Sequence, residues 1–183
     1  MSPTRLAFVA LLFVSVPSRA QAPAAPAADP ADVASPEAIV EAAYEALARE
    51  PGAPFQWDRF RSLFLPQATL VPNTEQTGGT LQVYSPEGFI AWIDASWAEH
   101  APIGSEKDKG FAEEGVHNVV HRYGDVAQVF STYQKRFWGS DQILGRGINS
   151  FQLVHHDGRW WIASIAWDEE TGAGPIPSEY GGE

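Results

Sequence analysis

The amino-acid sequence predicts an α+β fold in which three N-terminal helices pack on a curved, mainly antiparallel sheet. The first half of the chain has apolar residues at helical spacing, whereas from Val116 onward they follow the period of two typical of strands. The pairs Gly124-Asp125 and Asp157-Gly158 separate long alternating segments, as expected for β-hairpins. A length of 183 residues with 44% hydrophobic content is consistent with one domain.

Residues 1–22 have the three parts of a secretory signal peptide. Arg5 supplies the positive charge, residues 6–16 form an apolar segment, and Ala20-Gln21-Ala22 is a small-x-small cleavage site. The alternative, a membrane anchor, is disfavoured because a spanning helix needs about 20 apolar residues. We therefore expect cleavage after Ala22, or after Ala20, and a periplasmic or secreted mature protein.

The composition of the remaining chain predicts three further parts. Residues 23–34 are rich in alanine and proline and have little apolar bulk, which indicates a disordered linker. Residues 35–170 carry the helical and strand patterns and form the predicted domain. Residues 171–183 are rich in glycine and proline, which indicates a flexible tail.

Three segments of the domain are predicted to be helical. Ser35-Pro36 and Ser85-Pro86 each combine a helix-capping serine with a proline suited to the first helical position. Apolar residues then recur at helical spacing, and a proline or glycine stops the first two helices. The predicted helices span approximately 36–50, 57–64 and 86–100.

The remaining elements are predicted strands. Short apolar segments suggest strands at 68–71 and 81–84, and two long hairpins cover 116–136 and 146–167. In the closing hairpin, a two-residue turn at Asp157-Gly158 predicts regular pairing of opposed residues. With that register, both faces carry large apolar side chains: Val154, Trp161, Ile165 and Trp167 on one, and Phe151, Leu153, Trp160 and Ile162 on the other.

A sheet that is apolar on both faces needs two covers. The helices supply one, and for the other we expect a second copy of the chain, in a homodimer formed through the sheet. The alternative cover is the tail, whose Ile176, Pro177 and Tyr180 have the apolar surface to fold back over one face.

The domain resembles the nuclear transport factor 2-like superfamily, which includes ketosteroid isomerases and SnoaL-like proteins. The resemblance is carried by SLFLPQATLVPN at 62–73, YGDVAQVFSTYQKR at 123–136 and GINSFQLVHHDGRWWIASIAWD at 147–168. It covers most of the predicted domain and implies a cone-shaped fold. These motifs are structural, so they indicate a fold better than an activity.

The resemblance also implies where an isomerase would place its catalytic groups. Isomerases of this superfamily have an aspartate just past the first strand, but Val71-Pro72 stand there and neither takes a proton. A tyrosine of the first helix helps to bind the oxyanion, and Tyr44 occupies that position. Because Tyr44 belongs to an apolar stripe, a core role for it is favoured.

His117 and His121 lie four residues apart on one predicted strand and therefore share a face. A scytalone-dehydratase-like member of the superfamily uses strand histidines as acid and base, so His117 with Tyr44 is the candidate catalytic pair of an isomerase or dehydratase. No third ligand has recognisable metal-binding spacing, so we predict no metal site and no cofactor. Glu113-Glu114 are adjacent, point to opposite faces, and are interpreted as solvated charges.

A cone of this kind leaves a concavity with an aromatic lining. Such a pocket suits a small apolar or aromatic ligand, although the rings alone could fill the cone. We therefore predict a secreted, non-catalytic ligand-binding or interaction protein, with the enzyme as the alternative. The candidate ligand-binding residues are Tyr44, Trp92, Trp97, Tyr133, Asn149 and Trp167.

Charge and cysteine content exclude several other classes. The net charge of −11 disfavours binding to nucleic acid or to anionic membrane surfaces. The absence of cysteine excludes disulfides, thiol catalysis and a lipidated N-terminal cysteine.

Overall fold

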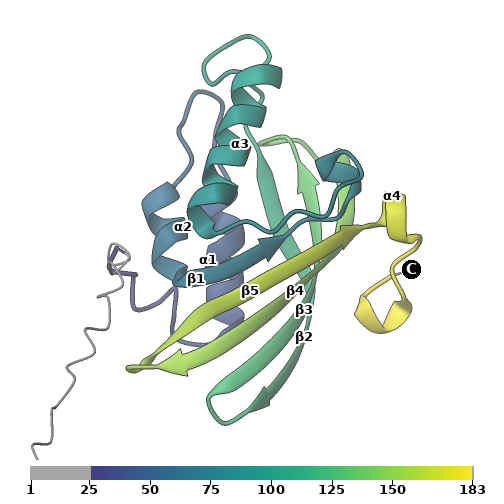
Figure 1. Ribbon diagram of the computed structural model, residues 1–183. Helices are drawn as coiled ribbons and strands as arrows, with labels where there is room; N and C mark the ends of the chain where they lie inside the picture. Colours follow the sequence, from purple (N-terminus) through teal and green to yellow (C-terminus); the bar gives the residue numbers. More distant parts are fainter. Residues whose placement is uncertain (1–25, 183) are drawn as a thin grey trace, which may run out of the picture.

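The structure, a computed structural model, describes residues 26–182 and shows three helices packed against a curved sheet (Figure 1). The predicted signal peptide and the first three linker residues lie outside the described residues. Within the described part, no helix is long and apolar enough to cross a membrane. The elements in chain order are α1 (Pro36–Leu47), α2 (Trp57–Leu63), β1 (Phe64–Val71), η1 (Glu75–Thr77), α3 (Pro86–His100), β2 (Ala112–Tyr123), β3 (Val126–Arg136), β4 (Ile143–His156), β5 (Arg159–Glu169), α4 (Glu170–Ala173) and η2 (Ser178–Tyr180).

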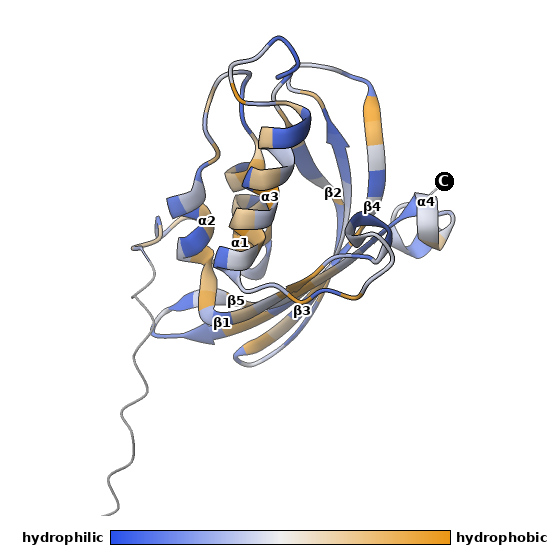
Figure 2. Cartoon of the chain, turned by 45° about the horizontal axis from the view of Figure 1, so that its top comes forward, coloured by the Kyte–Doolittle hydropathy of each residue, from blue (hydrophilic) through white to orange (hydrophobic). Residues whose placement is uncertain are grey.

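The sheet has the strand order β1-β5-β4-β3-β2. β1 pairs with β5 in parallel, and the other three pairings are antiparallel. Helices α1, α2 and α3 lie on one face of the sheet, where hydrophobic residues of helices and strands meet (Figure 2). We call this the inner face. The predicted α+β class, with N-terminal helices on a mainly antiparallel sheet, is confirmed.

Local sequence signals place most element boundaries. The side chains of Ser35 and Ser85 each accept a hydrogen bond from the backbone N–H three residues later, which caps α1 and α3. Asp157 and Gly158 both have positive φ, as a type I′ turn requires, so the predicted tight hairpin forms. One predicted strand is wrong: in 81–84 only Tyr84 bridges to β1, through Leu70.

The closing hairpin departs from the predicted register at a β-bulge. Next to the turn, Val154 pairs with Trp161 and Leu153 with Ile162, as expected. Beyond Gln152 the register shifts, so Phe151 faces Ile165 and Asn149 faces Trp167. Because an extra residue reverses the alternation of faces, Ile165 and Trp167 turn to the inner face. The prediction that both faces of this hairpin are strongly apolar is therefore wrong.

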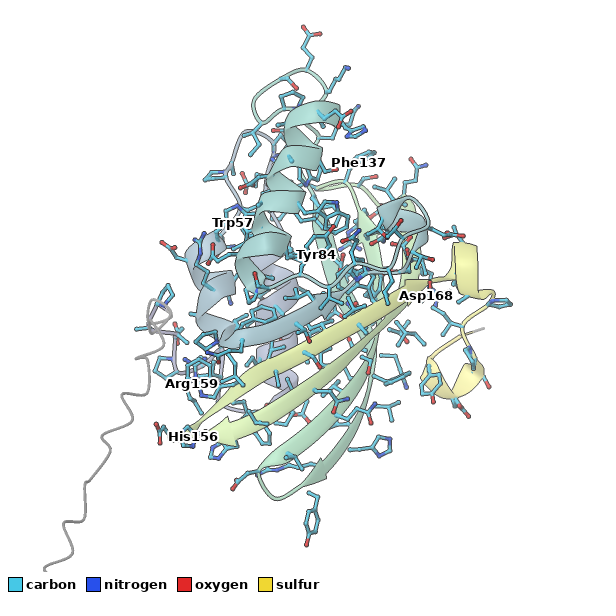
Figure 3. All side chains as sticks on the ribbon, in the orientation of Figure 1. Trp57, Tyr84, Phe137, His156, Arg159 and Asp168 are labelled. Atoms are coloured by element: carbon cyan, nitrogen blue, oxygen red, sulfur yellow. The ribbon has the colours of Figure 1, made fainter. Side chains whose placement is uncertain are left out.

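The outer face of the hairpin is correspondingly less apolar. Trp161 stays there but is half-buried, because the guanidinium of Arg159 lies 3.6 Å from its ring centroid. Arg159 and His156 flank the turn at the hairpin tip (Figure 3). Outward-facing Gln152 and Ala166 are exposed and add little apolar area.

Both ends of the domain are more ordered than the sequence indicates. Val33 is buried and its carbonyl accepts a hydrogen bond from the backbone N–H of Trp160, while Asp32 pairs with Arg59 at 2.8 Å. Ala28 also packs against the core, so the packed chain begins inside the predicted linker, where Asp32 has a distant cationic partner.

The predicted flexible tail also packs on the protein. Ile176 is buried, and the ring of Tyr180 lies 5.3 Å from that of Phe130. The carbonyl of Tyr180 accepts a hydrogen bond from Thr132 on β3. The tail therefore lies on the outer face of the sheet, as the alternative to a dimer predicted.

The homodimer through the sheet stays a prediction. Fewer apolar side chains support it than the sequence suggested, because the outer face is less apolar and the tail packs on part of it. Val116 and Val126 are still exposed on β2 and β3. Sedimentation equilibrium at micromolar concentration is expected to give twice the chain mass. A single-chain mass for the full-length mature protein would contradict the dimer and leave the tail as the cover.

Candidate functional site

A cavity of about 370 Å³ lies between α1, α3 and the inner face of the sheet. Its walls are mainly aromatic and aliphatic, and α3 contributes Trp92, Ile93, Ser96 and Trp97 from one side of the helix. Tyr84 stacks on Trp92, with ring centroids 5.3 Å apart, and buttresses this wall. The aromatic side chains therefore line the cone without filling it.

The six predicted ligand-binding residues all line this cavity, although ligand binding itself stays a prediction. They come from elements far apart in the sequence, namely α1, α3 and strands β3, β4 and β5. In sequence order they are Tyr44, Trp92, Trp97, Tyr133, Asn149 and Trp167.

One part of the cavity wall is polar and centres on Glu169 of β5. The Glu169 carboxylate accepts hydrogen bonds from Lys135, from Gln76 at 2.6 Å and from Tyr133 at 3.3 Å. Gln76 in turn accepts a hydrogen bond from the indole N–H of Trp167 at 2.9 Å. With three donors, including one cation, the buried carboxylate of Glu169 is well satisfied.

Tyr44 and Asn149 form a second polar group. The Tyr44 hydroxyl donates to Ser131 Oγ at 2.7 Å and accepts from Asn149 Nδ2 at 3.1 Å. Burial raises the pKa of Tyr44 well above its usual range, with a further contribution from Glu113. Since its proton is directed to Ser131, Tyr44 is a satisfied buried hydroxyl and does not aim a donor into the cavity.

Close approach between α1 and β2 positions this tyrosine. A Cβ atom on Gly115 would lie 3.0 Å from Cε2 of Tyr44 and 3.2 Å from Oγ of Ser131. Glycine at this position lets the Tyr44 ring lie against the strand and reach Ser131.

The structure separates His117 from Tyr44. His117 pairs with Thr132, whose hydroxyl is directed to the tail on the outer face, whereas the neighbouring Ser131 contacts Tyr44 on the inner face. His117 and His121 are both exposed. The candidate catalytic pair of His117 and Tyr44 is therefore wrong, because the sheet lies between the two side chains.

Glu113, like Gln76, Lys135 and Glu169, is a residue of the cavity wall that sequence reasoning missed. It lines the cavity, whereas Glu114 on the opposite face pairs with Arg136 at 2.6 Å and accepts from Gln134. The two carboxylates do point apart, but the prediction that both are solvated is wrong for Glu113.

The pKa of Glu113 reflects its environment. This pKa is raised to about 7, chiefly by removal of the carboxylate from water; attraction by Lys135 and hydrogen bonding by Asn149 oppose the increase, and repulsion from Glu169 adds to it. A carboxyl group that changes charge near neutral pH inside a cavity is typical of a functional site.

A β-bulge explains why the sequence does not reveal Glu113. Between Gly115 and His117 the β2–β3 register shifts by one residue. Regular alternation back from the inner-facing Val120 would have directed Glu114 into the cavity, and the bulge directs Glu113 there instead. Regular pairing from the turn would also place Lys135 opposite Glu114, so the pairing of Glu113 with Lys135 is visible only in the structure.

Comparison with known proteins supports the fold. No family model and no curated protein matches the sequence. A protein of unknown function with a cystatin-like fold from Nostoc punctiforme is 10% identical, with a TM-score of 0.56 over 75% of this chain and 95% of the other.

Two further structures are NTF-2-like proteins of unknown function. The protein from Silicibacter pomeroyi is 23% identical, with a TM-score of 0.44 over 73% of this chain and 91% of that one. The protein from Shewanella baltica is 13% identical, with a TM-score of 0.45 over 72% and 87% of the two chains. The likeness to the Nostoc punctiforme protein shows the fold alone: this chain has a cystatin-like α+β fold, in agreement with the predicted fold class.

Proposed function

We propose that the protein binds a small, largely apolar or aromatic molecule in the cavity between α3 and the sheet. The observation that carries this proposal is the unfilled cavity of about 370 Å³ with aromatic walls. Ligand pockets in proteins typically start at roughly 300 Å³ and combine apolar walls with a few placed polar groups. Here the polar groups are Glu113, Asn149 and the cluster around Glu169.

A binding role accounts for the polar groups better than the predicted acid–base pair does. Tyr44 is already committed to Ser131, and His117 lies on the other face of the sheet. The signal-peptide pattern of residues 1–22 further supports the proposal that binding takes place in the periplasm or outside the cell.

Filling the cavity from its rim tests the proposal. Ser96 lines the cavity from an exposed position on α3, so S96W is expected to place an indole in the space the ligand needs. The wild-type protein should bind the neutral apolar dye N-phenyl-1-naphthylamine with enhanced dye fluorescence. S96W should lower the affinity at least about tenfold by excluding the dye from the pocket.

A95W is the matched control, because Ala95 is exposed on the same helix and does not line the cavity. It should bind the dye like the wild type. Failure of the wild-type protein to bind the dye, or equal binding by S96W, would contradict the proposal.

A further inference from the structure

We infer that the ligand of this cavity carries a protonated amine and that the Glu113 carboxylate binds it. This inference rests on the proposed function and specifies the chemical class of the ligand. It follows from the charges along the cavity wall, from the position of Glu113 and from the aromatic lining.

Glu113, Lys135 and Glu169 are the charged residues that line the cavity in the part of the chain the structure describes. Lys135 and Glu169 form an ion pair, and Gln76 and Tyr133 supply the further donors to Glu169. That pair is electrically neutral and its carboxylate is satisfied. Glu113 therefore determines the net charge that a ligand meets, and this charge is negative when Glu113 is ionised.

Glu113 has no counterion of its own. Within residues 26–182 no lysine, arginine or histidine lies in salt-bridge distance of its carboxylate, and Lys135 is engaged by Glu169. A carboxylate that is half-buried in a cavity wall without a paired cation is costly, which explains the increase of its pKa to about 7. An ammonium group on the ligand would supply the missing charge and the hydrogen-bond donors.

Carboxylates outnumber cations around Glu113, where Lys135 is the one cationic side chain among the described residues that line the cavity. Glu113 and Tyr44 line both the cavity and a neighbouring groove between α1 and β2. The groove also exposes carboxylates of α1, so the local potential is negative. The titratable and charged groups around Glu113 are Glu37, Glu41, Tyr44 and Glu45 from α1, Glu114 from β2, Tyr133 and Lys135 from β3, and Glu169 from β5.

The aromatic wall is also suited to a cation. Trp92 and Trp167 line the cavity, and indole faces attract ammonium groups in addition to packing against apolar surface. Trp97 also lines the cavity, but the Arg49 guanidinium already lies over its ring, 4.5 Å from the centroid. A carboxylate ligand, in contrast, would lie beside Glu113 and compete with Glu169 for Lys135. The charges thus favour an amine over an acid of the same size.

Three ligands that share an indole separate these possibilities: tryptamine, 3-ethylindole and indole-3-propionic acid. Calorimetric titration of the mature wild-type protein at pH 8 is expected to show tryptamine binding at least about tenfold more tightly than 3-ethylindole, as for a hydrogen bond to a charged group. Indole-3-propionate should bind most weakly. Equal or tighter binding of 3-ethylindole or of the acid would overturn the inference while leaving the proposed function intact.

The variant E113Q assigns the preference to one carboxylate. It should bind tryptamine and 3-ethylindole with similar affinity, and thermal unfolding should show that it folds. E114Q removes the same charge one residue away, on the other face of the strand, and should keep the wild-type preference. Loss of the preference in E114Q, or its retention in E113Q, would show that direct contact with Glu113 is not the cause.

The pH dependence supplies an independent readout. Because Glu113 takes up a proton below pH of about 7, tryptamine must compete with that proton, and its affinity should fall as the pH decreases from 8 to 6. The affinity for 3-ethylindole should stay constant over the same range. A flat profile for tryptamine would contradict the role of Glu113, and absence of binding by all three ligands would overturn the proposed function as well.

Discussion

Replacing Asp108 by asparagine is expected to lower the free energy of unfolding by about 3–5 kcal/mol, the range for breaking a buried ion pair. Asp108 and Arg49 pair through two hydrogen bonds of 2.9 and 3.2 Å, and both side chains are almost fully buried. Asp108 also accepts hydrogen bonds from the backbone N–H groups of Gly52, Gly104 and Gly110. D108N would leave the Arg49 guanidinium buried without a counterion.

Urea denaturation at pH 7 measures this effect. The control is D58N, because Asp58 pairs with Arg61 at the surface, where its side chain is 86% exposed. The free energy of unfolding of D58N should be at most about 1 kcal/mol lower than that of the wild type. A similar small loss in D108N would show that the buried pair contributes little to stability.

The pH dependence of D108N follows from the lowered pKa of Asp108. Hydrogen bonds from Arg49 hold this pKa well below its ordinary value of 3.8, and the backbone donors act in the same direction. The stability that Asp108 contributes is therefore present above pH 3.8 and declines as the pH falls toward its folded-state pKa. The difference in the free energy of unfolding between the wild type and D108N should therefore become smaller below a pH of about 4.

Replacing Phe60 by alanine is expected to destabilise the protein by a similar amount, about 3–5 kcal/mol, through lost burial and a new void. Phe60 belongs to α2, is 1% exposed and packs against β1 and α3. Its ring is 4.5 Å from that of Phe64 and 5.5 Å from that of Phe89. Truncation would remove the aromatic contacts of α2 with β1 and α3 beside the cavity.

Thermal and urea unfolding of F60A would be compared with Y123A. Tyr123 is also an aromatic residue but is 88% exposed at the β2–β3 turn, so its truncation should change stability by less than about 0.5 kcal/mol. If F60A and Y123A lowered the free energy of unfolding by similar amounts, packing around Phe60 would not be a major source of stability.

Local signals in the sequence determined the fold class and most of the element boundaries. The serine caps of α1 and α3, the apolar stripes of the helices and the glycine-containing turns depend on residues close together in the chain. Their combination was sufficient to predict the α+β fold and the helix and strand positions that bring Tyr44, Trp92 and Trp97 to one cavity.

Only the tertiary structure decided which faces several strand residues occupy. The bulge in β5 turned Ile165 and Trp167 inward, and the bulge near Gly115 turned Glu113 into the cavity. Each bulge reverses the alternation beyond it, and its position depends on packing against other elements. Partners distant in sequence likewise decided the roles of Asp32, Asp108 and the tail, because a charged or apolar residue gives no local signal of what it will contact.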